Sequence, residues 1–379
     1  MKTLGERVKK RSRIMIVIVS FLLVLVLVFI CLDGTFLPKK YNSIWSDKYI
    51  EKLEDDQSKM IAYGLRAASS HNTQPWLMKR IDSNTIELYA NMDKALYVVD
   101  VDFKQLLMSQ GTFIESYKMG AKQYGYNVNI EYSKPNFNEK MPLIATMKVK
   151  KIREINKTDA VSSCTYSSVI TKQDYDFEEI LNKCIAEYPG FSYNLIDSKA
   201  EVEKLESYLL EGTIIESRDE GVMKELLNVF RWTEWEKNEY RYGLSLNSIT
   251  GIVKPFIQPI MKASSKNWES FGKSSIKSFK DRLVTQNKYI LIKCDNSDDL
   301  KYIHDGQLYQ KLVFEVSDYN LRPAMQVLEN FDAIKNLNIE FQNEYGVDSE
   351  VVFVIGLQEK TDTTITSNPR HLVEDIIIK

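Results

Sequence analysis

The sequence predicts an α+β fold made of two related lobes and preceded by one transmembrane helix. Three observations support this fold class. A long apolar segment lies near the N-terminus, helix-like and strand-like segments then mix irregularly, and one helical segment in the first half has a similar copy in the second half. The mixture lacks the strict alternation of helix and strand that a doubly wound sheet requires, which favours the α+β class.

Composition sets the broad class of protein. At 379 residues with 44% hydrophobic content, the chain is long enough for two folded units with an ordered core. Its formal net charge is -2, and the residues after the N-terminus include no basic stretch interleaved with aromatics. These features exclude nucleic acid as an expected partner.

The first element is the uncharged run 14–32, "IMIVIVSFLLVLVLVFICL". As a helix it spans roughly 29 Å, close to the apolar thickness of a bilayer. Residues 1–13 are basic, so the positive-inside rule places them in the cytoplasm and the remaining chain outside the cell membrane, after a tether at 33–50. A cleaved signal peptide is the alternative, but the run is long for one and no small-x-small cleavage site follows it.

The later elements follow from apolar spacing and turn residues. We expect a first lobe at 51–155 and a second at 156–379. Helical spacing predicts helices at 51–68, 103–124, 176–186, 202–216 and 220–236, and β-branched runs predict a hairpin at 76–90 and strands from 142, at 288–294 and at 351–357. The aromatic, proline-broken stretch at about 230–280 is typical of packing between lobes, of a lid or of a membrane contact, and the sequence leaves these open.

An internal repeat supports the two lobes. "GTFIESYKMGAKQYGYNV" matches "GQLYQKLVFEVSDYNLRP", with Gly111 and Tyr124 at the same spacing as Gly306 and Tyr319. The apolar positions between them also correspond. A matching apolar register of this kind indicates a duplicated unit.

The segment 65–76, "LRAASSHNTQPW", is the densest run of hydrogen-bonding side chains between a predicted helix and a predicted strand; we call it the motif loop. The amides of Asn72 and Gln74 offer donors and acceptors together, which suits the edge of a planar heterocycle such as flavin. Ser69, Ser70 and His71 can reach ribityl or phosphate oxygens. The alternative is a capping segment whose side chains only satisfy backbone groups.

The motif loop also resembles a known family. "AASSHNTQPW" is similar to the A-P-S-x-H-N-T/S-Q-P-W stretch of nitroreductase-superfamily flavoproteins, most specifically the single-chain twin-domain branch, the Acg-like FMN-binding proteins. The resemblance continues through "ELYANMDKALYVVDVDFKQLLMSQG", "ELLNVFRWTEWEKNEYRYGL", "DGQLYQKLVFEVSDYNLRPAMQVLE" and "NPRHLVEDII", over roughly residues 50 to 379. It implies twin nitroreductase-like lobes that form an internal pseudo-dimer with FMN between them.

The resemblance also implies a set of FMN-binding residues. The first half would contribute Ser69, Ser70, His71, Asn72 and Gln74, and the second half Lys172, Pro323, Ala324 and Arg370. Arg322 is more typical of a surface charge, although it could help to hold phosphate. This sequence departs from the family pattern mainly at the phosphate end of the site. Ser168 and Thr171 stand where the family has Arg and Asn, and Lys172 replaces an arginine. Lys94 and Lys104 also replace arginines, and Ala68 replaces a proline. A lysine gives a point charge where arginine gives a bidentate fork, so weakened FMN affinity is expected.

These residues imply an FMN-dependent oxidoreductase that passes electrons from NADH, NADPH or another donor to a nitroaromatic, quinone or similar acceptor. Flavin carries that chemistry, so no catalytic side chain is expected. The alternatives are flavin storage without turnover and a degenerate cofactor-free scaffold. His71, His304 and His371 are dispersed without a metal motif. Cys164, Cys184 and Cys294 are expected to be core thiols, although one pair among the three could be bridged.

Overall fold

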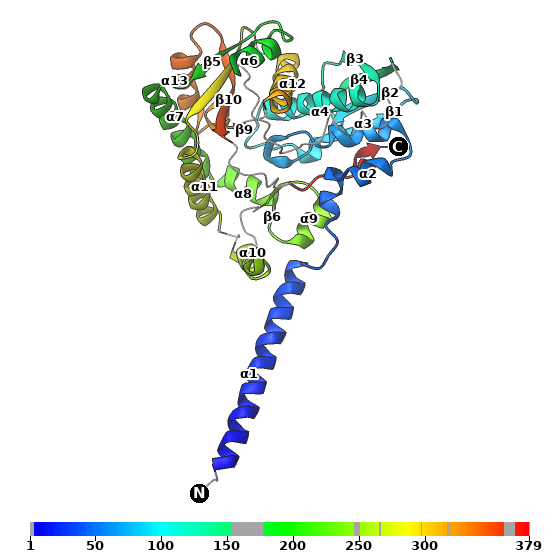
Figure 1. The fold of residues 1–379 in the computed structure, drawn as a ribbon. Coiled ribbons are helices and arrows are strands. Elements are labelled where there is room, and N and C mark those ends of the chain that lie inside the picture. Colours follow the sequence, from blue (N-terminus) through cyan, green and yellow to red (C-terminus); the bar gives the residue numbers. More distant parts are fainter. Residues whose placement is uncertain are drawn as a thin grey trace.

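The computed structural model describes residues 4–152, 177–245, 251–264, 267–296, 298–316, 319–359 and 368–378. The chain has a mixed α+β fold, and α1 (Leu4–Asp33) projects from it as a single long helix (Figure 1). Within α1, Ser12–Asp33 is long and apolar enough to cross a membrane. The fold class and the N-terminal apolar helix are therefore as the sequence predicts.

The first sheet follows the predicted hairpin. Its order is β11-β1-β2-β4-β3. The strands are β1 (Trp76–Arg80), β2 (Thr85–Ala90), β3 (Tyr126–Tyr132), β4 (Leu143–Lys151) and β11 (Ile377–Ile378). β11, from the C-terminal end of the chain, runs parallel to β1, whereas the other neighbours are antiparallel. Helix α3 (Asp56–Gly64) precedes β1, and α4 (Lys104–Gln123) joins β2 to β3.

The second sheet has the order β5-β8-β10-β9, with every neighbouring pair antiparallel. Its strands are β5 (Phe191–Ile196), β8 (Lys288–Cys294), β9 (Tyr319–Pro323) and β10 (Glu350–Glu359). Helix α6 (Phe177–Ile185) precedes β5, and α12 (Asp299–Glu315) joins β8 to β9.

The two sheets share one topology. In each, the four main strands occur in space in the order first, second, fourth, third, and one long helix connects the second strand to the third. A short helix also precedes the first strand of both. This shared order is what a duplicated unit produces, and it extends the internal repeat beyond the helix in which the sequence contains it.

The two repeated helices cross at their glycines. A Cβ atom added to Gly111 of α4 would lie 1.9 Å from the carbonyl oxygen of Ile303, and one added to Gly306 of α12 would lie 1.9 Å from that of Met108. Only glycine allows backbones to approach so closely. The contact is reciprocal, and it brings α4 and α12 together in the middle of the folded part (Figure 1).

One continuous core underlies both sheets, and a second core covers the far side of the second sheet. On β8, Ile290 and Ile292 belong to the shared core, whereas Tyr289 and Leu291 face the second core. Because both faces of β8 are buried, the central residues 289–292 form a continuous apolar run rather than an alternating one. α7 (Lys199–Arg218) and α13 (Lys335–Tyr345) contribute to the second core.

A long insertion separates β5 from β8, whereas β1 and β2 are joined by a tight turn. It contains α7 and, after it, α8 (Glu220–Asn228), β6 (Phe230–Arg231), α9 (Glu234–Tyr240), β7 (Leu244–Ser245), η4 (Gly251–Val253), α10 (Lys254–Ser264) and α11 (Trp268–Leu283). The single helix expected at 220–236 is thus divided into α8 and α9. Thr233 and Glu236 form a capping box that starts a new helix at α9.

Two expectations near the N-terminus gain detail. The tether expected at 33–50 contains η1 (Lys40–Trp45) and the start of α2 (Asp47–Glu51), and its residues Tyr41 and Ile44 are buried against the fold. The helix expected at 51–68 is shorter, since the side chain of Asp55 accepts a hydrogen bond from Ser58 N at 2.7 Å and caps α3 there.

The C-terminal segment, residues 368–378, crosses to the first half of the chain. It contains α14 (Val373–Ile376) and β11. Trp45 Nε1 donates to the carbonyl of Asn368 at 3.0 Å, and Arg370 N donates to the carbonyl of Tyr41 at 3.0 Å. The expected lobe boundary at 155/156 lies outside the described residues.

Candidate functional site

A cavity of about 250 Å³ opens where the two repeated units meet. Its walls come from the motif loop, from helices α4 and α12, and from strands β7 and β10. The end of β9 and the segment that follows it complete the wall. The lining residues are Ala68, Ser69, Ser70, His71, Gln105, Met108, Ser109, Thr112, Leu244, Tyr309, Pro323, Met325, Gln326, Glu329 and Phe353. Of the residues expected to bind a cofactor, Ser69, Ser70, His71 and Pro323 are on this wall.

The motif loop has an unusual backbone. His71, Asn72 and Gln74 have φ angles of 45°, 56° and 51°, in the left-handed region that side-chain-bearing residues rarely occupy. Each such residue costs on the order of 1–3 kcal/mol, and the conformation persists only where surrounding contacts hold it. Strain concentrated in this way is a feature of functional sites, and here it lies beside the cavity.

Hydrogen bonds from both repeated helices hold the cavity side of the loop. Ser70 Oγ donates to Gln105 Oε1 at 2.6 Å, and Ser70 N donates to Ser109 Oγ at 3.0 Å, both on α4. Ala68 N donates to Gln310 Oε1 of α12 at 3.1 Å. The loop position therefore depends on the α4–α12 crossing.

Asn72 and Gln74 point away from the cavity. Asn72 Nδ2 donates to the carbonyls of Gly243 and Pro369 at 2.9 and 3.0 Å, and its Oδ1 accepts from Arg370 Nη1. Gln74 Nε2 donates to the carbonyl of Pro369 at 3.1 Å, and its Oε1 accepts from His371 N at 2.9 Å. Both amides thus bind the C-terminal segment.

Arg370 lies with these amides and is buried rather than solvated. Its Nη2 donates to the carbonyl of Ala67 at 3.0 Å, and its guanidinium carbon lies 5.2 Å from the ring centre of Trp45. Ala324 is also buried, and its N–H donates to the carbonyl of Val354 at 2.9 Å. Lys172 lies outside the described residues.

A buried acidic group borders the cavity. Glu216 of α7 and Glu329, just after η5 (Gln326–Leu328), are 3% and 5% exposed, and their carboxylate oxygens lie within 4.8 Å of each other and of a ring nitrogen of His71. Gln105 Nε2 donates to Glu329 Oε1 at 3.4 Å, whereas Oε2 of Glu329 has no hydrogen-bond partner among the described residues. Carboxylates and an imidazole are ligand types for a divalent metal ion, so these three residues could hold one.

Burial controls the protonation of this group. It raises the pKa of Glu216 to about 7, with Arg282 opposing the shift, and raises that of Glu329 well above its usual range, with the charge of Glu216 adding to the effect. It lowers the pKa of His71 to about 4. The imidazole is therefore neutral at pH 7. The sequence contained no signal for Glu216, because only the fold brings α7 to the motif loop.

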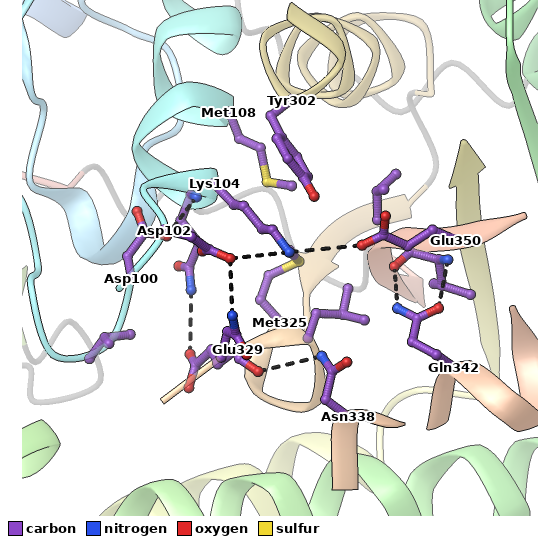
Figure 2. A pocket seen from close by; sticks show the side chains of 16 residues that line it. Asp100, Asp102, Lys104, Met108, Tyr302, Met325, Glu329, Asn338, Gln342 and Glu350 are labelled. Carbon is purple, nitrogen blue, oxygen red and sulfur yellow. Dashed lines mark hydrogen bonds and ion pairs between the residues drawn. The ribbon is translucent and has the colours of Figure 1, made fainter. Parts of the chain in front are cut away.

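A small pocket of about 20 Å³ lies beside the cavity and shares Gln105, Met108, Met325 and Glu329 with it (Figure 2). Here Lys104 pairs with Asp102 at 3.2 Å and with Glu350 at 3.8 Å. Lys104, the first residue of α4, therefore neutralises the carboxylates of Asp102 and Glu350. Figure 2 shows Glu329 on the side of the pocket opposite Tyr302.

Lys94 and the aromatic residues of the insertion support the C-terminal segment. Lys94 Nζ contacts His371 Nε2 and lies 3.6 Å from the ring centre of Tyr242. Burial lowers the pKa of Lys94 to about 7. The Phe230 and Trp232 rings pack at 4.2 Å between centroids, which is core packing. Within the stretch expected as a possible lid, Leu244 is the described residue that lines the cavity.

Cysteine and histidine placement agrees in part with expectation. Cys184 and Cys294 are buried free thiols, as predicted, and Cys164 lies outside the described residues. His304 packs between the rings of Tyr132 and Tyr188, at 5.3 and 5.9 Å between centroids.

Comparison with protein-family models and with curated proteins finds no match to this chain. Its function is therefore inferred from its own residues and geometry.

Proposed function

We propose that the chain is a membrane-anchored, nitroreductase-like flavoprotein that binds FMN in the cavity between its two repeated units. It would transfer electrons from a reduced donor to a nitroaromatic, quinone or similar acceptor. One observation carries the proposal: the motif loop, which resembles the flavin-binding stretch of that family, lines a cavity between two units of identical strand order. Two such units in one chain are what a fused nitroreductase dimer requires.

The described wall suits the ring of a flavin. Tyr309 and Phe353, which both line the cavity, stack on each other at 4.9 Å with an interplanar angle of 12°, so the wall includes an aromatic pair. Gln326 Oε1 and Glu329 Oε2 are acceptors without hydrogen-bond partners among the described residues. Each can accept an N–H or O–H from a bound heterocycle, which removes the cost of leaving it unpaired.

The phosphate end fits less well. Among the described residues, the cavity wall includes no lysine or arginine, and Glu329 would repel an anion unless it is protonated. Phosphate recognition therefore depends on Lys172, which stays a prediction. If Lys172 binds the phosphate, FMN binds more tightly than riboflavin. Equal affinities for FMN and riboflavin would mean that the protein recognises the flavin ring and not the phosphate.

The predicted roles of Asn72, Gln74 and Arg370 change within this proposal. Their hydrogen bonds are made to each other and to the backbone of the C-terminal segment and its neighbours. They would act as positioning residues that fix the strained motif loop. Ser69, Ser70, His71 and Pro323 would remain on the surface that faces the ligand.

The expected membrane topology affects which electron donors the protein can meet. With residues 1–13 in the cytoplasm, the folded part lies outside the cell membrane, where nicotinamide cofactors are scarce. Flavin binding without turnover, for storage or protection, is therefore the second candidate function. A cofactor-free scaffold is the third.

Visible absorbance of the full chain in detergent separates these functions. We expect a yellow protein, or one that becomes yellow on titration with FMN, and bleaching after anaerobic addition of NADPH identifies a working reductase. Colour that persists with NADPH and with a reduced quinone favours storage. A protein that stays colourless with FMN rejects both flavin functions.

A matched pair of variants tests whether flavin occupies this cavity. Gln326→Leu removes an acceptor from the wall, and we expect FMN affinity to fall about fivefold, since a hydrogen bond contributes roughly 1 kcal/mol. Gln358→Leu, on β10 but away from the cavity, should leave affinity unchanged. Equal affinities for the two variants would place the flavin elsewhere.

A further inference from the structure

The end of α1 is built into the folded part. Trp235 Nε1 of α9 donates to the carbonyl of Cys31 at 2.9 Å. Gly34, at φ 77°, leaves no room for a Cβ, which would lie 2.7 Å from the Trp235 ring. Asp33 is fully buried. The apolar helix therefore has a fixed position relative to α9, as expected of a retained anchor rather than of a removable leader.

Helix α10 packs against the same end of α1. The rings of Phe29 and Phe256 lie 5.6 Å apart, and Figure 1 shows α10 next to the point where α1 enters the fold. Phe29 precedes Asp33, the end of the apolar span, by four residues. At about 1.5 Å per residue, α10 contacts α1 at a level roughly 6 Å inside that end.

One side of α10 is polar and is held by α9. Lys254 pairs with Glu234 at 2.8 Å, and Lys262 pairs with Glu236 at 3.0 Å. Glu234 also accepts from Tyr41 Oη at 2.6 Å and from Lys237 Nζ at 3.0 Å. These charges fix the orientation of α10.

The opposite side of η4 and α10 is apolar and exposed. Ile252, Val253, Ile257 and Ile260 are 86%, 50%, 36% and 55% exposed. Val253, Ile257 and Ile260 recur at spacings of four and three, which places them on one helical face. Phe36, just after α1, is 83% exposed. Such an apolar surface in water is unfavourable.

We propose that η4 and α10 lie in the outer leaflet of the membrane that α1 crosses, with Val253, Ile257 and Ile260 facing the lipid. An amphipathic interfacial helix buries its apolar face about 5–10 Å into the headgroup region, and the Phe29–Phe256 contact sets α10 at that depth. This rests on α1 crossing the membrane and is independent of flavin binding. The stretch that the sequence left between lid and membrane contact is thereby assigned to the membrane.

Depth-dependent quenching in the full chain tests the proposal. Ile260→Cys, in a variant whose Cys31 and Cys164 are replaced by serine, is labelled with an environment-sensitive fluorophore and reconstituted in phosphatidylcholine–phosphatidylglycerol nanodiscs. We expect lipids with a nitroxide near the headgroup to quench the label at least twofold and iodide in the buffer to have little effect. The same label at Val284, an 86% exposed apolar residue at the end of α11, is the control and should respond to iodide alone.

If the label at residue 260 responds to iodide as the Val284→Cys control does, α10 lies in water and the proposal is wrong. A second label at Ile257→Cys guards against a local effect of one substitution. Both positions are exposed, so neither variant is expected to impair folding. Flavin content has no influence on either outcome.

Discussion

At the scale of single residues, the motif loop combines strain with dense hydrogen bonding. His71, Asn72 and Gln74 hold left-handed backbone conformations, and the two amides bind the C-terminal segment. The sequence predicted that these side chains belong to one site. It could not predict that the amides point away from the cavity, because their partners come from residues about three hundred positions later.

Asn72→Ala tests this structural role. The change removes the acceptor of Arg370 and leaves a buried guanidinium with one partner fewer, so the free energy of unfolding should fall by about 2–4 kcal/mol. Denaturant unfolding of the full chain in detergent measures it. Asn72→Asp, which keeps an acceptor for Arg370, should lose less. Unchanged stability together with lost flavin would instead indicate a direct ligand contact.

The lowered pKa of the buried His371 predicts that the fold loses stability in acid. Burial lowers its pKa from 6.5 to about 4. Between these values the unfolded chain binds a proton that the folded chain does not, so stability falls as pH decreases from 6.5 to 4. Glu216 acts in the opposite direction, since its raised pKa weakens the fold as pH increases from about 4.5 to 7.

His371→Gln should therefore remove up to about 3 kcal/mol of the loss between pH 6.5 and 4. Unfolding curves of the natural chain and the variant, recorded across this range, give the difference directly. A variant with the same pH dependence as the natural chain would show that His371 is protonated in the fold at its ordinary pKa.

At the scale of elements, the helices and strands with strong local sequence signals were predicted, whereas features that depend on tertiary contacts were missed. Helix α4, the β1–β2 hairpin and strands β4, β8 and β10 are confirmed, because apolar spacing and turn residues determine them locally. The split of 220–236 into α8 and α9 was missed, since a capping box interrupted a helical pattern. The fold of residues 33–50 was missed because Tyr41 and Ile44 bury against distant parts of the chain.

The glycine crossing of α4 and α12 gives a prediction at this scale. Gly306→Ala would place a methyl group 1.9 Å from a backbone carbonyl oxygen, so the helices must separate. We expect a loss of more than about 3 kcal/mol of stability or failure to fold. Gly221→Ala in α8 is the control: its Cβ would meet only side-chain atoms, at 3.2 and 3.3 Å, and stability should change by less than about 1 kcal/mol. Equal effects at both glycines would contradict the crossing.

At the scale of the whole molecule, the sequence predicted an α+β protein with a repeated unit and an N-terminal apolar helix. Two features depend on long-range contacts and had no local signal. One is the return of β11 to the first sheet, and the other is the Glu216–Glu329 pair at the cavity. Residues more than a hundred positions apart form both, so neither could be read from spacing.

Removal of residues 368–379 tests how far the C-terminal segment unites the halves. The truncated chain loses β11 and the partners that Asn72 and Gln74 have in this segment, so we expect the thermal midpoint to fall sharply and the motif loop to become sensitive to protease. A chain that ends at Ile378 is the control and should match the natural protein. If the longer truncation has no effect on the midpoint, the segment is only an appendage.

The shared strand order has a consequence for how the two halves can change. In a symmetric pair of identical chains, every substitution occurs in both copies of a site. Here the connection from α3 to β1 contains the eleven residues 65–75, which supply most of the motif loop, whereas the connection from α6 to β5 has only the five residues 186–190. Within one chain, each repeated unit can change independently of the other. The first unit carries the motif loop that lines the cavity, and the second carries the insertion that contacts the end of α1.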